Sequence, residues 1–336
     1  MKLSVVICTY NYAHLLPDTL KSVAAQTLQD FELLIVDDGS TDKTEEVAGD
    51  FRLQFQDFRY VKKSHTGPAD TRNVGVCEAR GTHIAFLDAD DLWPPDYLSA
   101  MREALNANPQ ADIVLCEGII FRSDNGVITE TALERALPSV CGPASSPQDL
   151  FGIIRALSPS GMVFSKDLYK RTGPFDMESF GWFSEDIDWA FRALLVGAFC
   201  VCLKRRLYLY RRHAGNLTNK ASNSFRSWLK IYSHTLKEAR RDPRVEVLAR
   251  GVIRSHSVRL LPTCATGESR QLLSLAIDTL GGDWVIRLCY MGTFVGLVGL
   301  LKPAKQAGRL LHRLTRRKLK IDAGKSPGSI FEALSE

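Results

Sequence analysis

A regular alternation of short apolar runs and helical segments over the first 115 residues constrains the fold of this chain more than any other feature. Runs rich in β-branched residues are typical of buried strands, and apolar residues spaced by three and four are typical of helices. Strands are predicted at residues 3–8, 31–36, 59–62, 83–87 and 113–117, and helices at residues 15–23, 69–79 and 95–106. Alternating strands and helices predict an α/β fold, in which a parallel sheet has helices on both faces.

Carboxylates follow two of these strands. Asp37 and Asp38 begin the segment DDGSTD after one strand, and Asp88, Asp90 and Asp91 end another. Ligands of open parallel sheets bind beyond the carboxyl ends of the strands, where these acids are expected to lie. Like charges this close together are costly unless a cation neutralises them, and carboxylate oxygens suit Mg²⁺ or Mn²⁺. The structural alternatives are a helix N-cap at the first segment and a solvated turn at the second.

Two further segments carry groups suited to chemistry. Glu185 and Asp186 open an amphipathic helix, where acids complement the helix dipole or, alternatively, provide a general base for an acceptor hydroxyl. Arg212 and His213 follow a predicted strand at residues 200–210 and are suited to bind a diphosphate or a metal, although such a histidine is often an ordinary surface residue. Each segment alone is compatible with a purely structural role.

Taken together and in this order, the segments resemble glycosyltransferase family 2, whose members have the GT-A fold, a Rossmann-like nucleotide-binding sheet with helices on both faces. The matching segments are Ser4–Asn11, Asp37–Asp42, Gly67–Asn73, Leu87–Asp91, Gly173–Asp176, Ser184–Asp188 with Arg192, and Tyr210–His213. The resemblance covers residues 1–218 and leaves out the C-terminal third. It implies a metal-dependent, inverting enzyme that moves a sugar from a nucleotide donor, most commonly a UDP-sugar, to an acceptor hydroxyl.

The resemblance also implies roles for individual residues. On the donor side are Thr9, Tyr10 and Asn11, with Tyr10 stacked on the base; Asp37 and Asp38, with Asp38 at the base edge; Arg72, facing the donor; and Asp88, near the ribose or the metal. On the other side are Asp90 and His213 as ligands of Mn²⁺ or Mg²⁺, Arg212 at the diphosphate, Asp186 as the catalytic base, and Glu185 and Trp182 beside the acceptor. A single displacement by the acceptor oxygen would invert the configuration of the anomeric carbon.

Two other functions stay open at this point. A nucleotidyltransferase is expected to carry a glycine-rich phosphate loop after the first strand, where this chain has Thr9-Tyr10-Asn11-Tyr12. A non-catalytic nucleotide-sugar-binding protein of the same fold is expected to have lost one of the acids. Asp38, Asp90 and Asp186 are all present, which favours the enzyme.

Length and composition are those of a folded protein, with a catalytic domain expected at residues 1–218 and a helical region at residues 219–336. Helices are predicted at residues 225–240, 245–260 and 268–280, and a loop at residues 120–150, which contain several Pro, Gly and Ser. The eight cysteines are scattered without a C-x-x-C pair, and the N-terminal apolar run is too short for a signal peptide. We therefore expect reduced thiols and a cytoplasmic location.

The C-terminal region has a marked charge asymmetry. Residues 284–301 are apolar and interrupted only by Arg287, and every charged side chain in the tail at residues 302–320 is basic, whereas the net charge of the whole chain is +5. The apolar segment is too short to span a bilayer, but an apolar segment beside a basic one is typical of proteins that bind anionic membranes.

The alternative is a buried helix beside a solvated cationic helix. The single sign of the charges favours the inner face of the cell membrane, and with it a saccharide or lipid-linked saccharide acceptor, as in assembly of bacterial surface polysaccharide or glycolipid. A nucleic-acid partner is not expected, because the core has no recognisable motif for reading nucleic acid.

Overall fold

The computed structural model describes residues 2–124, 127–133, 136–178, 184–216 and 266–280, with the single residues Leu229, Arg287 and Tyr290. The chain separates into two compact units at His213–Ala214, and the site described below belongs to the first. In the second, helix α10 (Thr266–Leu280) forms where the sequence predicts residues 268–280. Apart from the three single residues, the predicted helices at 225–240 and 245–260, the apolar segment 284–301 and the basic tail 302–320 lie outside the described residues. No helix in the described ranges has the length and apolar character needed to cross a membrane.

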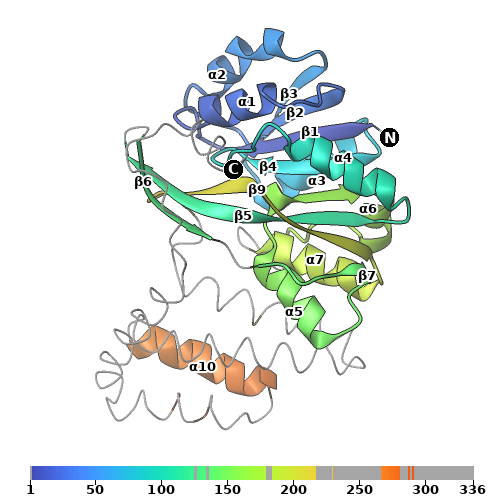
Figure 1. The fold of residues 1–336 in the computed structure, drawn as a ribbon. Helices are drawn as coiled ribbons and strands as arrows, with labels where there is room; N and C mark the ends of the chain where they lie inside the picture. The colour runs from blue at the N-terminus through green and yellow to red at the C-terminus, as the bar shows by residue number, and fades with distance from the viewer. Residues whose placement is uncertain are drawn as a thin grey trace. The chain divides into compact units, whose positions relative to one another are not determined.

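The first unit consists of one sheet with helices against it (Figure 1). The strands are β1 (Leu3–Thr9), β2 (Phe31–Asp37), β3 (Phe58–Lys62), β4 (His83–Asp88), β5 (Ile113–Asp124), β6 (Val127–Leu133), β7 (Cys141–Pro143), β8 (Met162–Ser165) and β9 (Phe199–Arg212). The helices are α1 (Leu16–Ala24), α2 (Thr44–Asp50), α3 (Pro68–Glu78), α4 (Tyr97–Ala107), α5 (Pro147–Ala156), α6 (Lys166–Thr172) and α7 (Glu185–Leu195), with short 3₁₀ turns at Arg52–Gln54 and Pro159–Gly161.

The strand order is β3-β2-β1-β4-β8-β5-β9-β7, and β6 pairs with β5 off this path. In Figure 1 the strands follow one another from β3 at the top down to β5 and β9. β1 is parallel to both neighbours, with Ile7 opposite Ile35 in β2 and Leu87 in β4. The predicted strands run parallel as expected, including β5 with β9, whereas the unpredicted β8 is antiparallel to β4 and β5, and β7 is antiparallel to β9. The outcome is a mixed α/β sheet.

Helices cover both faces of this sheet, as predicted. On one face Val5 and Ile7 of β1 form a core with Leu20 of α1 and apolar residues of α4. On the other face α3 lies so close to β1 that a Cβ on Gly75 would be 2.5 Å from Cγ1 of Val6. The three β1 side chains are fully buried, and each contributes about 1.5–3 kcal/mol relative to an exposed position. The central strands therefore fix the loops at their carboxyl ends.

A buried carboxylate ties the opposite, amino-terminal edge of the sheet together. Glu32 of β2 accepts hydrogen bonds from Ser4 Oγ at 2.6 Å, from the backbone N–H of Arg80 at 2.7 Å and from Arg59 Nη1 at 3.1 Å. Burial acts to raise the pKa of Glu32, but these hydrogen bonds outweigh it and hold the pKa below its usual value. The carboxylate is therefore ionised at neutral pH and stabilises the junction of β1 and β2.

Residues 120–150 contain more regular structure than the predicted loop. β5 continues to Asp124 and forms a hairpin with β6, and β7 and α5 follow. Ser146 caps α5 by accepting a hydrogen bond from the backbone N–H of Asp149 at 3.0 Å, and Pro147 occupies the first turn. The loop prediction is wrong here because Ser and Pro begin a helix in this sequence as readily as they form a turn.

Strand β9 reaches the carboxyl edge of the sheet with an irregular register. Leu203 pairs with Cys116 of β5, but Tyr208 pairs with Gly118, so β9 contains three residues more than β5 in this stretch. Such bulges bend a strand and increase its twist. Beyond them the β9 backbone bridges to the loop that follows β4. The end of β9 thus lies beside the acids of that loop.

Candidate active site

Most of the predicted site residues lie at the carboxyl edge of the sheet, at or directly after the ends of β1, β2, β4 and β9, and others lie on helices α3 and α7. Burial raises the pKa of the Asp88 carboxyl; Arg72 opposes this effect, and the neighbouring carboxylates of Asp90 and Asp186 add to it. Burial likewise raises the pKa of the Cys8 thiol to about 12, with Asp88 among the contributing charges. These electrostatic effects require proximity, so acids far apart in the sequence are neighbours in the fold.

Asn11 joins the loop after β1 to the loop after β2. Its φ of 57° is in the left-handed region, which asparagine tolerates better than most residues. Its Oδ1 accepts hydrogen bonds from the backbone N–H groups of Thr41 at 2.8 Å and Asp42 at 3.3 Å. Its own N–H donates to Ser40 Oγ at 2.8 Å. Asn11 therefore shapes the donor-side loops, and its predicted direct contact with the donor remains a prediction.

Asp37 is fully buried and closes its own turn. One oxygen accepts hydrogen bonds from Ser40 N–H at 2.9 Å and Ser40 Oγ at 2.5 Å, and the other accepts from Tyr60 Oη at 2.5 Å. This is the turn that aspartate favours through side-chain bonding to its following backbone. The structure therefore accounts for Asp37 through the shape of the loop, whereas the buried Asp38 bonds to residues that follow β3.

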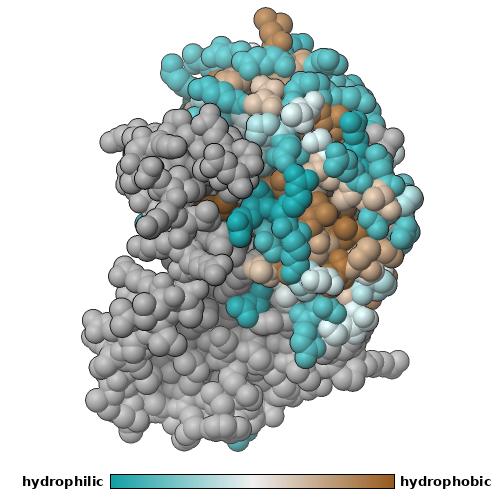
Figure 2. All heavy atoms as spheres, viewed as in Figure 1, coloured by the Kyte–Doolittle hydropathy of each residue, from teal (hydrophilic) through white to brown (hydrophobic). Residues whose placement is uncertain are grey.

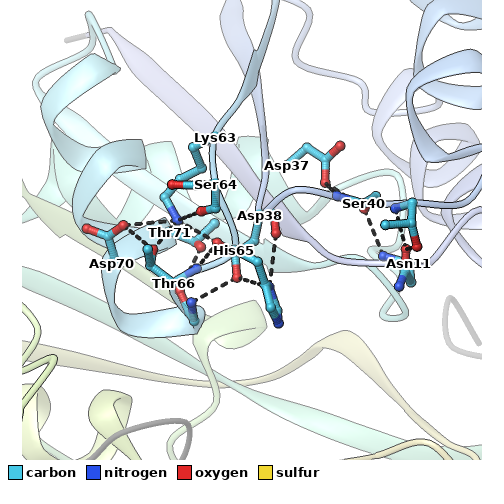
Figure 3. Close-up of polar contacts among 12 residues, drawn as sticks. Asn11, Asp37, Asp38, Ser40, Lys63, Ser64, His65, Thr66, Asp70 and Thr71 are labelled. Atoms are coloured by element: carbon cyan, nitrogen blue, oxygen red, sulfur yellow. Dashed lines mark hydrogen bonds and ion pairs between the residues drawn. The ribbon is translucent and has the colours of Figure 1, made fainter.

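Asp38 is the centre of a polar cluster with residues 63–67, which follow β3 (Figure 3). Its carboxylate accepts hydrogen bonds from Lys63 Nζ at 2.5 Å, Thr66 N–H at 3.0 Å and Gly67 N–H at 2.9 Å. Nδ1 of His65 lies 2.9 Å from the same carboxylate. Burial acts to raise the pKa of Asp38, but these hydrogen bonds outweigh it and lower the pKa, so the group is ionised.

The two residues before Asn11 offer the features of a ring-binding surface. Tyr10 is 37% exposed, one of five large apolar or aromatic side chains so exposed among the described residues. The hydroxyl of Thr9 is buried and has no hydrogen-bond partner in the described part of the chain. A buried polar atom without a partner is costly, which favours a ligand at this position.

Arg72 of α3 connects the end of β4 to helix α7, which carries the predicted catalytic base Asp186. It is 7% exposed, and its Nη2 lies 3.1 Å from Asp88 Oδ1, while its Nη1 contacts Glu185 at the start of α7. The Nε of Arg72 has no partner in the described ranges. Arg72, Asp88 and Glu185 are thus brought together. The sequence predicts that Arg72 and Asp88 lie on the same, donor side, but it does not predict the contact with Glu185.

The three acids after β4 have three different environments. Asp90 Oδ2 lies 2.9 Å from His213 Nε2, so these two predicted metal ligands meet although they are far apart in the chain. Asp91 is fully buried and accepts hydrogen bonds from Ser160 Oγ at 2.6 Å and from the N–H of Arg211 at 2.9 Å. Burial, together with the charges of Asp90 and Asp88, raises the pKa of Asp91 well above its usual value. Asp91 is therefore part of the scaffold.

The chemistry of Asp90 and His213 fits a divalent ion. No group of three His, Cys, Asp or Glu side chains able to hold a metal is found in the residues that the structure describes. A carboxylate and an imidazole supply two ligand atoms, and ions such as Mg²⁺ are commonly held by one or two protein groups together with substrate phosphates. The pair thus suits a metal that arrives with a diphosphate, not one enclosed by protein alone.

Helix α7 presents Asp186 at its first turn. Asp186 is half-buried, and its Oδ1 accepts the N–H of Ile187 at 2.8 Å. By contrast, Asp188 is fully buried and lies 2.8 Å from Arg192 Nε, so it holds the helix in place. Asp186 is therefore the acid of this helix available to an acceptor. The predicted acceptor residue Trp182 lies outside the described residues.

Two consecutive arginines at the end of β9 have opposite roles. Arg211 is 3% exposed; its Nε donates to the carbonyl of Asp90 at 2.8 Å, and its Nη2 lies 3.0 Å from Asp18 in α1. Arg212 is half-buried and makes no ion pair with the described residues. The sequence analysis did not single out Arg211. A signal was present, because consecutive residues of a strand point to opposite faces, so one of Arg211 and Arg212 had to face inward.

Lys63 and His65 were also missed, and the signal for them is present in the sequence. Both follow a predicted strand, and the rule that identified Asp38 applies equally to them. On the face shown in Figure 2, hydrophilic residues cover most of the described surface around α1 and α2.

Comparison with known proteins identifies the family. The family model for glycosyl transferase family 2 matches residues 4–173, half of the chain. An uncharacterised glycosyltransferase of Nostoc, alr2836, is 33% identical over 184 residues, which cover 52% of this chain and 54% of that protein. The chain thus spans about half the length of this curated relative.

Solved structures share the fold. S. aureus TarS 1–349 in complex with UDP-GlcNAc superposes with a TM-score of 0.66 at 19% identity, covering 88% of this chain and 89% of that one. The mannosyltransferase PcManGT of Pyrobaculum calidifontis, in complex with GDP-Man and Mn²⁺, gives a TM-score of 0.54 at 20% identity, covering 90% and 82%. The sheet is therefore that of the GT-A fold, and the chain belongs to glycosyltransferase family 2.

Proposed function

We propose that the protein is a metal-dependent, inverting glycosyltransferase that moves a sugar from a UDP-sugar to an acceptor hydroxyl. The observation that carries this proposal is the meeting of Asp90 with His213 at 2.9 Å, near Asp88, which Arg72 links to Glu185, the residue before Asp186 in α7. Family membership supports the reaction class, the UDP-GlcNAc complex of TarS supports the donor, and the Mn²⁺ complex of PcManGT supports the metal.

In the proposed reaction Asp186 accepts the proton of the acceptor hydroxyl as its oxygen bonds to the anomeric carbon. The bond between that carbon and the diphosphate oxygen breaks on the opposite face, and the diphosphate leaves with the electron pair. Arg212 offsets the charge that develops on it, and Asp90 and His213 would hold the divalent ion. When bound, that ion supplies further charge stabilisation to the leaving group. One displacement inverts the configuration.

A donor screen tests the proposal. The full chain is incubated with Mn²⁺ and a panel of UDP- and GDP-sugars, and nucleoside diphosphate release is measured. Asp186→Asn is expected to lose turnover while it still binds UDP with Mn²⁺, because the amide cannot accept the proton. Asp167→Asn, an exposed acid of α6 away from the site, serves as the matched control and is expected to turn over normally. Binding of a donor without turnover by the wild-type protein would favour a non-catalytic binding protein, and nucleotide transfer would favour a nucleotidyltransferase.

We further propose that the protein acts at the inner face of the cell membrane on a saccharide or lipid-linked saccharide acceptor, in assembly of surface polysaccharide or glycolipid. The support is the sequence of the apolar segment 284–301 and the basic tail 302–320. Co-sedimentation with vesicles of anionic and of neutral lipid, with and without residues 284–336, tests this. Equal sedimentation of the two forms with anionic vesicles would refute it.

A further inference from the structure

The rings of Tyr10 and His65 lie face to face. Their centroids are 3.7 Å apart and their planes differ by 16°, so the two faces are in contact and no third ring fits between them. Aromatic pairs prefer offset or edge-to-face arrangements at about 4.5–7 Å, because stacked π faces repel. The close parallel arrangement therefore requires other groups that hold His65 in place.

Asp38 provides such groups. Nδ1 of His65 lies 2.9 Å from the Asp38 carboxylate and 3.0 Å from the Asp38 carbonyl oxygen. An ionised carboxylate and a carbonyl only accept hydrogen bonds, so Nδ1 carries the proton. Figure 3 shows the His65 ring beside Asp38, at the end of the loop that follows β3. The imidazole thus presents an aromatic face to Tyr10 and a ring N–H to Asp38 at the same time.

The Asp38 carboxylate has no capacity to spare. Two oxygens offer about four lone-pair positions; Lys63 and the N–H groups of Thr66 and Gly67 use three, and Nδ1 of His65 lies against the remaining one at 2.9 Å. A ligand that donates to Asp38 must therefore replace one of these donors. The two N–H groups belong to the backbone that leads into α3, and Lys63 is held a second time by Asp70, at 2.9 Å.

His65 is the donor that can leave. Its side chain is 36% exposed, against 13% for that of Lys63, and the other two donors are backbone groups. Its departure uncovers one face of the Tyr10 ring and leaves an Asp38 carboxylate oxygen as a hydrogen-bond acceptor at the edge of that face. A nucleobase with a ring N–H has the same two features. Uracil and guanine present such a group, whereas the corresponding ring nitrogens of cytosine and adenine are acceptors.

We propose that His65 is a built-in substitute for the donor's base. It occupies the stacking face of Tyr10 and one acceptor position of Asp38 until a uracil- or guanine-type base displaces it, and it thereby sets which bases are accepted. This inference rests on the proposed function and deepens it by assigning a specificity-determining residue to the same site.

Calorimetric titration of the full chain with UDP in the presence of Mn²⁺ tests the proposal. His65→Ala is expected to bind UDP about fivefold or more tightly than the wild-type protein, because a hydrogen bond and a stacked pair no longer have to be broken. His65→Phe, which keeps stacking but cannot bond to Asp38, is expected to lie between the two. His83→Ala, at the amino end of β4, is the matched control and is expected to leave UDP affinity unchanged. Pyrophosphate with Mn²⁺ is expected to bind all four proteins equally, since it has no base.

A measurement on the wild-type protein follows the displacement directly. The Cε1–H resonance of His65, assigned through its loss in His65→Ala, is expected upfield in the free protein because the Tyr10 ring lies over it. Saturation with UDP is expected to move it to the position of a solvated histidine, and pyrophosphate is expected to leave it in place.

The possible outcomes distinguish failure of this inference from failure of the proposed function. If the wild-type protein binds UDP, and His65→Ala binds it equally or more weakly, His65 is not a substitute for the base and this inference alone fails. A His65 resonance unmoved by saturating UDP would lead to the same conclusion. If neither protein binds any nucleotide while pyrophosphate binds, the proposed function fails, and the inference fails with it.

Discussion

Replacement of Arg211 by methionine is expected to destabilise the protein more than the same change at the next residue. The Arg211 guanidinium donates to the Asp90 carbonyl at 2.8 Å, pairs with Asp18 at 3.0 Å and lies 5.1 Å from the centre of the Phe121 ring. Methionine fills similar space but leaves these acceptors without their donor. Asp18 is 39% exposed and is hydrated by water once Arg211 is gone, so breaking this ion pair costs little free energy of unfolding.

The hydrogen bond to the Asp90 carbonyl and the ring contact place the expected loss of unfolding free energy at about 2–4 kcal/mol, given about 1.5–3 kcal/mol for a hydrogen bond from a charged group and about 0.5–1 kcal/mol for the ring contact; the pair with the exposed Asp18 adds little. Arg212→Met, which removes a half-buried guanidinium without an ion pair to the described residues, is expected to cost less than about 1 kcal/mol. Urea unfolding of the wild-type protein and both variants gives the comparison. Equal losses for the two variants, or a loss below about 1 kcal/mol for Arg211→Met, would refute the claim that Arg211 secures the loop of Asp90.

Three further changes test the scaffold and the site. Gly161→Ala would place a Cβ 2.4 Å from Cε1 of the buried Tyr208 ring and is expected to cost about 1–3 kcal/mol in thermal unfolding, whereas Gly49→Ala, which meets nothing within 4 Å in α2, is expected to be neutral or stabilising. Glu32→Gln is expected to destabilise the protein at pH 6 but much less at pH 3. The lowered pKa of Glu32 means that its contribution is present above the ordinary pKa of about 4.5 and is lost as the pH falls through the lowered value; a pH-independent difference would contradict this. Asp90→Asn is expected to weaken Mn²⁺-dependent UDP binding about tenfold or more in calorimetry, an effect that EDTA should reproduce in the wild-type protein; unchanged Mn²⁺ dependence would remove Asp90 from the metal site.

The first half of the fold could be predicted from the sequence because its signals are local. The runs at residues 3–8, 31–36 and 83–87 are mostly apolar and almost entirely buried, and they match β1, β2 and β4 closely. β8 could not be recognised in the same way. It has four residues, and its antiparallel pairing depends on β5, a partner about fifty residues earlier in the chain.

The candidate site shows the same division. The sheet brings the ends of its strands together, so the sequence could predict that Asp90 and His213 lie near each other, and they meet for this reason; their function stays a prediction. Their individual tasks could not be separated by sequence. Asp88, Asp90 and Asp91 look alike in the sequence, and only packing shows that Asp91 is enclosed while Asp90 faces His213. Arg72 was expected to face the donor, but its contact with Glu185 depends on where α7 docks.

The three extra residues in β9 determine where His213 lies relative to Asp90. Had β9 paired with β5 without bulges, the same chain would have run on by three residues, about 10 Å at the usual rise of a strand, before reaching His213. The imidazole would then have overshot Asp90. The number of residues between Leu203 and Tyr208 is therefore as decisive for the metal-binding pair as the identity of the ligands, and an insertion or deletion there would separate them without altering either one.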